Sequence, residues 1–156
     1  MRASHFQIIW AWAVLAAVAG ASMAPQSPAE LAGHATLVIT GLVEQVKSYA
    51  PLDSSRNFYT EARIRVTSTA VGNTSEDVVV VRYPGGEIAG MAWVVEDQPT
   101  FREGEQVIVY LAPGPRGGYV CPDGVLSKLT VVEDSVLGDG RTVNEYLAAV
   151  AAAAHR

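Results

Sequence analysis

Few residues in this sequence of 156 amino acids have side chains suited to catalysis or metal binding, and they lie far apart. Only two histidines, His34 and His155, lie beyond Ala21, and neither has a second histidine or a cysteine at the spacing of a metal site. Cys121 is the only cysteine, and no histidine is near it in the sequence. We therefore predict no metal site. Cys121 is either a small apolar residue of the fold or the link of a disulfide-bonded dimer.

The sequence also lacks the usual motifs of catalysis by a serine nucleophile or by paired carboxylates. The sequence contains neither G-x-S-x-G nor S-x-x-K, and its only histidines beyond Ala21 lie near the two ends. Paired carboxylates such as Glu103 and Glu105 occur at the start of an expected strand, where charged turn residues are common. We predict that the protein is not an enzyme, has no catalytic residues and needs no cofactor.

Aromatic residues are the better candidates for recognition. Trp93 is the only tryptophan beyond Ala21, and it lies in an irregular segment near Tyr83. Large aromatic residues on a loop above a sheet often bind partners, but they also plug the ends of barrels, which is the interpretation we favour for Trp93. The candidate binding residues are Trp93, Tyr83, Glu87, Tyr59 and Tyr119.

The balance of charge argues against two classes of partner. Without the segment 1–21 the chain has 10 Lys and Arg against 16 Asp and Glu. Nucleic acids and anionic membranes both require clustered basic residues, and the only basic density, at Arg63, Arg65 and Arg82, is too small for a groove that follows phosphates. We predict no nucleic-acid partner.

The N-terminus has the pattern of an export signal. Arg2 precedes an unbroken apolar run from Ile8 to Ala19. This run is shorter than the roughly 20 residues of a spanning helix and suits a signal peptide. Cleavage after Ala21 fits the small-x-small rule better than cleavage after Ala24, because Pro25 would follow the second site. We predict a signal peptide over 1–21, a secreted or periplasmic protein, and no stable membrane insertion after cleavage. An uncleaved N-terminal anchor helix is the other interpretation.

The expected fold is organised around one strand. This strand lies within the segment Phe101 to Leu111, FREGEQVIVYL. Its odd positions from Val107 give an aliphatic face, whereas Gln106, Ile108 and Tyr110 give a mixed face that we expect to be half exposed. Other expected strands lie at 35–46, with a bulge or bend at Gly41, and at 57–69, 77–83, 119–121 and 125–132, and the segment 89–96 is a candidate hairpin arm. Five or six short strands predict a mainly β fold, either a small barrel or a sandwich.

Two helices complete the prediction. The capping boxes Ser27–Glu30 and Thr142–Glu145 predict a short helix to about Ala32 and a C-terminal helix to Ala154. The second helix should pack through one stripe of side chains: Val143, Leu147, Val150, Ala151 and Ala154. The expected organisation is a signal peptide (1–21), an N-terminal segment with a short helix (22–34), a β domain (35–134), and a linker with the C-terminal helix (135–156).

Five segments carry a resemblance to a known family: TLVITGLVEQV, YTEARIRVTSTAVG, RYPGGEIAG, PTFREGEQVIVYL and TVNEYLAAV. Between Leu31 and Leu147 the chain resembles uncharacterised secreted bacterial and archaeal proteins with an OB-like barrel, which are distantly similar to the netrin-like domain of tissue metalloprotease inhibitors. The resemblance implies a five- or six-stranded antiparallel OB-like barrel, with the C-terminal helix packed on it, and a role in binding. Those inhibitors chelate zinc through an N-terminal cysteine. Here the expected mature start, Ser22 or Pro25, has none, so that mechanism is not implied.

Together these observations predict a secreted, non-catalytic module that binds a protein or glycan in the envelope or extracellular space. The alternatives are a protease inhibitor or protease-associated module, and a structural envelope component without a discrete ligand. An inhibitor would insert a protruding loop, for which only 85–100 is long enough. A glycan-binding protein would gather Trp93, Tyr83, Tyr59 and Tyr119 on one face.

Overall fold

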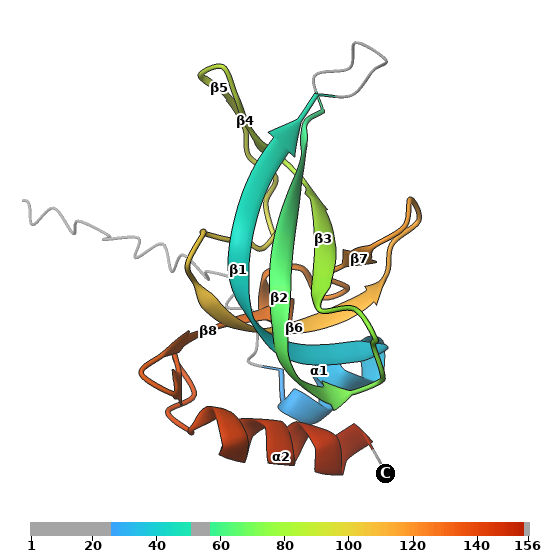
Figure 1. Cartoon of the computed structure of the whole chain (residues 1–156), viewed down its shortest axis with the longest axis vertical. Helices are drawn as coiled ribbons and strands as arrows, with labels where there is room; N and C mark the ends of the chain where they lie inside the picture. Colours follow the sequence, from blue (N-terminus) through green and yellow to red (C-terminus); the bar gives the residue numbers. More distant parts are fainter. Residues whose placement is uncertain (1–25, 51–56, 155–156) are drawn as a thin grey trace, which may run out of the picture.

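The computed structural model describes residues 26–50 and 57–154, in which the fold is mainly β with one helix near each end (Figure 1). The predicted signal peptide lies outside the described residues. In chain order the elements are α1 (Pro28–His34), β1 (Leu37–Tyr49), β2 (Tyr59–Val71), β3 (Val78–Pro84), β4 (Gly86–Ile88), β5 (Met91–Trp93), β6 (Gln106–Pro113), β7 (Tyr119–Val120), the 3-10 helix η1 (Gly124–Ser127), β8 (Lys128–Val132), β9 (Ser135–Val136) and α2 (Val143–Ala154).

Five strands form a closed hydrogen-bonded ring. β1 pairs antiparallel with both β2 and β6, and β2 pairs antiparallel with β3. β3 contacts β7 in a parallel pair at Val81 and Tyr119, and β7 returns to β6. β8 and β9 extend the sheet beyond β6, whereas β4 and β5 form a separate hairpin. The predicted five or six strands are too few. β7 lies within the expected strand 119–121 and β5 within the candidate arm 89–96, but β4 and β9, of two or three residues, are too short to show a period.

The ring closes because β1 bends at Gly41, as the sequence predicted. The register between β1 and β2 shifts between Thr40 and Gly41, and Gly41 also pairs with Val107 of β6. A Cβ atom at Gly41 would lie 2.5 Å from both the carbonyl oxygen of Arg65 and the Cγ2 of Ile64. Only glycine therefore allows β1 and β2 to approach this closely where β1 curves (Figure 1).

One apolar cluster fills the interior of the ring. The odd-numbered residues of β6 point into it, as predicted from their aliphatic face. Its buried members are Leu37, Ile39, Val43, Ala62, Ile64, Val79, Val81, Tyr83, Phe101, Val107, Val109, Leu111 and Cys121.

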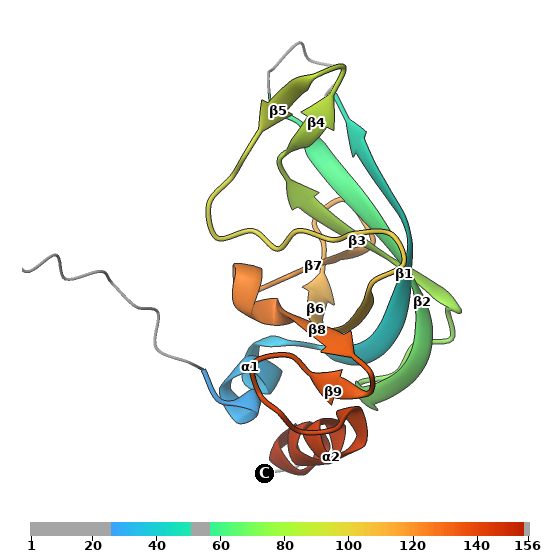
Figure 2. The same ribbon diagram turned by 90° about the vertical axis from the view of Figure 1, so that its left-hand side faces the viewer.

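A second apolar cluster lies between the sheet and the two helices (Figure 2). The prediction of a half-exposed face on β6 is wrong for Ile108 and Tyr110, which are fully buried. α1 and α2 pack on each other and cover this face. The hydroxyl groups of Tyr110 and Tyr146 lie 2.9 Å apart, and burial raises the pKa of both phenols. This contact joins α2 to the middle of the sheet.

Both predicted capping boxes are present. The hydroxyl of Ser27 accepts a hydrogen bond from the amide of Glu30, whose carboxylate accepts one from the amide of Ser27. Thr142 and Glu145 make the same exchange. α1 continues to His34, beyond its predicted end at Ala32.

The buried face of α2 differs in part from the predicted stripe. Val150 is buried, and Val143 and Leu147 pack against the second cluster. Tyr146, which the stripe omitted, is buried, whereas Ala154 is exposed. The prediction followed aliphatic residues alone and so missed the aromatic residue that faces the sheet.

Candidate binding surfaces

The β4–β5 hairpin projects from one end of the strand ring (Figures 1 and 2). Its turn residues Ala89 and Gly90 have φ values of 51° and 79°, which suits a tight two-residue turn. At its base Gly86 has a φ of 143°, and a Cβ there would collide with the hydroxyls of Ser48 and Thr60. Glycine at this position lets the hairpin rest directly on the ends of β1 and β2.

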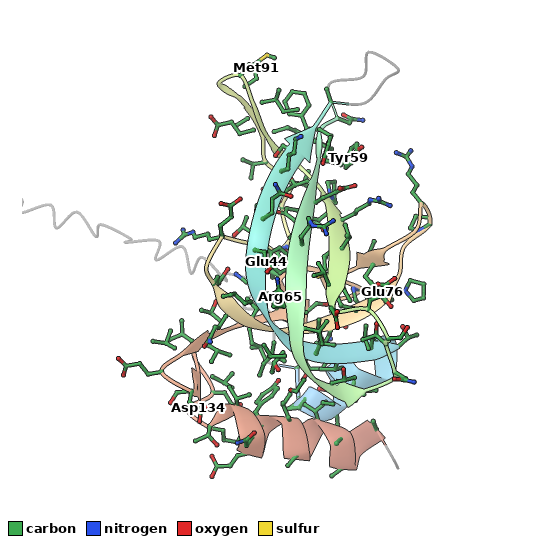
Figure 3. The ribbon with its side chains drawn as sticks, viewed as in Figure 1. Glu44, Tyr59, Arg65, Glu76, Met91 and Asp134 are labelled. Atoms are coloured by element: carbon green, nitrogen blue, oxygen red, sulfur yellow. The ribbon has the colours of Figure 1, made fainter. Side chains whose placement is uncertain are left out.

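Two apolar side chains on this hairpin and just after it face solvent. Met91 is 61% exposed and Val94 is 84% exposed, and Figure 3 shows Met91 at the far end of the hairpin. Met91 lies beside the turn and Val94 follows the base pair Gly86–Trp93, and we call these two exposed side chains together the hairpin tip. Both are missing from the predicted binding residues, which centre on Trp93. An Ala-Gly turn flanked by apolar residues is the hairpin signal that would have indicated them.

A groove of about 400 Å³ lies beside the hairpin, and we call it the hairpin groove. Trp93, which is half-buried, and Glu87, which is exposed, both line it. The amide of Glu87 donates a hydrogen bond to the hydroxyl of Ser48. The segment 94–101, which returns the chain to β6, forms another wall.

Tyr83 closes this end of the ring rather than standing free. Its side chain is buried and its ring lies 5.6 Å from that of Phe101, centroid to centroid. Burial raises the pKa of the Tyr83 phenol, although hydrogen bonding at Phe101 and Thr60 opposes the shift. Of the predicted binding residues, Tyr83 is therefore the one that packs as a plug.

The predicted aromatic residues do not gather on one face. Tyr59 stacks on Tyr49 at the outer face of the sheet, with ring centroids 5.2 Å apart and an interplanar angle of 16°. Tyr83, opposite Thr60 on the neighbouring strand, packs in the ring interior, and Tyr119 packs against the interior cluster from its edge. The structure thus brings Trp93, Glu87 and Tyr83 together along the hairpin groove, whereas Tyr59 and Tyr119 do not line that groove.

A second groove, of about 390 Å³, runs between the ends of β2 and β3 and the β6–β7 loop, and we call it the loop groove. Arg82 fixes its shape. The Nε of Arg82 donates to Glu61 at 2.7 Å, and its Nη1 donates to the carbonyls of Arg116 and Gly117 at 2.6 and 2.8 Å. Tyr59 and Tyr83 also line this groove, so Tyr83 belongs to both grooves.

No protein-family model and no curated protein matches this chain. No helix in residues 26–50 and 57–154 is long and apolar enough to cross a membrane. In the same residues, no three His, Cys, Asp or Glu side chains are placed to hold a metal ion. His34 instead pairs with Asp123, at 2.8 Å between Nδ1 and Oδ1.

Cys121 is placed to be chemically inert. Its side chain is buried in the interior cluster, and burial raises the pKa of the thiol to about 12. Since the thiolate is the reactive form, we expect native Cys121 to react with a maleimide about a thousandfold more slowly than a free thiol near pH 8. Mass spectrometry of timed reactions, with the denatured protein as the reference, measures this ratio. Rapid labelling of the native protein would contradict it.

Proposed function

We propose that the protein is a secreted, non-catalytic module that binds another protein through the β4–β5 hairpin. The observation that carries the proposal is the exposure of Met91, at the far end of a hairpin that stands clear of the ring, and of Val94, just after the base of that hairpin. Exposed apolar side chains on and beside a protruding element are candidate contacts for a protein partner.

The surroundings of the hairpin tip support this role. The half-buried Trp93 and the hairpin groove lie next to it, so a partner can meet projecting side chains and a recess together. Protein interfaces are built from such apolar anchors within a more polar rim. Burial of each tip side chain on a partner would contribute about 1.5 kcal/mol or more.

We further propose that the strand ring is an OB-like barrel with one hairpin inserted between its third and fourth strands. The supporting observation is the ring order β1-β2-β3-β7-β6, closed by the β1–β6 pairing. Export rests on the N-terminal signal pattern at 1–21.

A protease inhibitor or protease-associated module is the second candidate. The β4–β5 hairpin is the protruding part of 85–100, the only stretch that the sequence indicated to be long enough to enter a protease cleft. The identity of the captured partner decides between an inhibitor and an adaptor.

The test compares variants of the hairpin tip with a matched surface variant. The purified protein is immobilised and exposed to culture supernatant and envelope extract of its source, and retained proteins are identified by mass spectrometry. We expect a specific protein to be retained by the wild type, and the Met91→Gln/Val94→Gln variant to retain at least about tenfold less of it. Leu137→Gln is the control, because Leu137 is 64% exposed but lies after β9. Equal retention by all three proteins would refute the role of the hairpin.

A further inference from the structure

Basic residues gather on the outer face of β1, β2 and β3, although the whole chain has a formal net charge of −5. Of the eight lysines and arginines in the described residues, five lie on this face or on the adjoining β6–β7 loop: Lys47, Arg63, Arg65, Arg82 and Arg116. We call these five residues the basic face. Among the described acidic residues, only Glu44 and Glu61 lie on the same three-strand surface.

Strand pairing creates this concentration of charge. Residues two apart on a strand point to the same side, so Arg63 and Arg65 share the outer face with Glu61. Glu61 lies opposite Lys47 on β1 and opposite Arg82 on β3. Figure 3 shows Glu44 and Arg65 side by side on the front of β1 and β2, with Tyr59 further along β2.

The two acidic side chains neutralise only part of the basic face. Glu44 pairs with Arg65, and Glu61 pairs with Arg82. Arg63 and Arg116 are exposed and form no ion pair with any described residue. Two guanidinium groups therefore remain available to an anion. Arg116 lines the loop groove, and Arg63 lies opposite Val80 on the same outer face as Tyr59.

We propose that the basic face and the loop groove bind an acidic polysaccharide, one that carries carboxylates on its sugar rings. Guanidinium groups bind carboxylates through paired hydrogen bonds. The apolar faces of sugar rings can pack on Tyr59 and on the prolines that line the loop groove, Pro84 and Pro115. This site is separate from the hairpin tip and does not depend on the proposed function.

The composition of this face favours a polysaccharide over an acidic protein. A protein interface needs large apolar anchors at its centre. The large apolar side chains that are exposed in the described residues lie elsewhere: Met91, Val94, Val125, Val132 and Leu137. An open groove edged by guanidinium groups and aromatic rings fits an extended, charged chain of sugars better. The turn that carries Glu76 and Asp77 lies at the other end of β2 and β3 and limits the face there.

The test measures binding of polygalacturonate oligomers to the purified protein by calorimetry. Neutral dextran oligomers show whether binding requires charge on the sugar chain. Poly-glutamate of equal charge shows whether an acidic polypeptide binds as well as the polysaccharide does. We expect polygalacturonate to bind, dextran not to bind, and poly-glutamate to bind at least about fivefold more weakly. Raising the salt from about 0.05 M to about 0.5 M should weaken the binding by about tenfold.

Variants connect the binding to named residues. We expect Arg63→Gln/Arg116→Gln to weaken polygalacturonate binding by about tenfold and Tyr59→Leu by about threefold. Arg102→Gln is the control, because Arg102 is also exposed and forms no ion pair with any described residue, but lies in the turn before β6. Thermal unfolding should be unchanged, since neither Arg63 nor Arg116 has an ion-pair partner among the described residues. The proposal is overturned if polygalacturonate does not bind, if poly-glutamate binds equally well, or if Arg102→Gln matches the double variant.

Discussion

Replacement of Gly41 by valine is expected to lower the free energy of unfolding by about 3 kcal/mol. Any Cβ at this position would lie 2.5 Å from the backbone oxygen of Arg65, and the backbone cannot move aside without disturbing both partners of β1. A β-branched residue favours strands in general, so propensity alone predicts the opposite result. The clash outweighs the strand propensity and makes the substitution destabilising, because it occurs where the ring closes.

Urea unfolding followed by circular dichroism measures the effect of Gly41→Val as a fall in the transition midpoint of about 1 to 2 M. The matched control is Gly33→Ala. Gly33 lies within α1, and no atom is within 4 Å of the place where its Cβ would be. Alanine is a better helix former than glycine, so this variant should be at least as stable as the wild type. A stable Gly41→Val protein would show that the bend does not require glycine.

Removal of the charge of Glu105 is expected to destabilise the fold by about 2 to 3 kcal/mol at neutral pH. Burial alone would raise the pKa of this carboxyl, but hydrogen bonds from Lys128 and Thr130, at 2.6 and 2.7 Å, outweigh it and hold the pKa below its usual value. Lys128 also donates to the carbonyl of Thr100. In Glu105→Gln, a cation with a side chain only 13% exposed loses its counter-charge.

The same pair gives a definite dependence on pH. Because the pKa of Glu105 is lower in the folded state than in the unfolded chain, its contribution is complete above the ordinary glutamate pKa. The contribution disappears as the pH falls through the lower, folded value. The difference in unfolding free energy between wild type and Glu105→Gln should therefore be largest at neutral pH and shrink in acid. Glu96→Gln, at an exposed position with no ion pair among the described residues, should show no such trend. A pH-independent difference would mean that packing, not charge, accounts for the loss.

Sequence patterns that lie within one short segment predicted the local structure of that segment well. Both capping boxes, the bend at Gly41 and the inward face of β6 follow from residues that are close in the sequence. The start of the expected strand 125–132 is instead the 3-10 helix η1. Its first residue, Gly124, has a φ of 55°, and a Cβ there would strike the backbone of Asp97. A contact with a distant segment therefore sets this turn, and alternation within the segment gives no sign of it.

The binding surfaces depend on pairings that no single segment reveals. The sequence showed basic density at Arg63, Arg65 and Arg82, but Lys47 and Arg116 join them only through strand pairing and the fold of the β6–β7 loop. Tyr59 and Tyr83 point to opposite sides because Thr60, not Tyr59, lies opposite Tyr83. The sequence does not give the register of β2 against β3, so it does not decide whether Tyr59 and Tyr83 lie on the same side of the sheet.

The packing of α1 against α2 has a consequence for the order in which the molecule can assemble. The two helices stand at opposite ends of the described chain, yet both cover the same face of the sheet, over Val38, Ile108 and Tyr110. While α2 is still being synthesised, only α1 can cover that face. The strand ring can collapse earlier, because the segments that form its interior precede α2. A nascent chain would thus pass through a half-covered intermediate, whose apolar surface stays accessible to chaperones until α2 is complete.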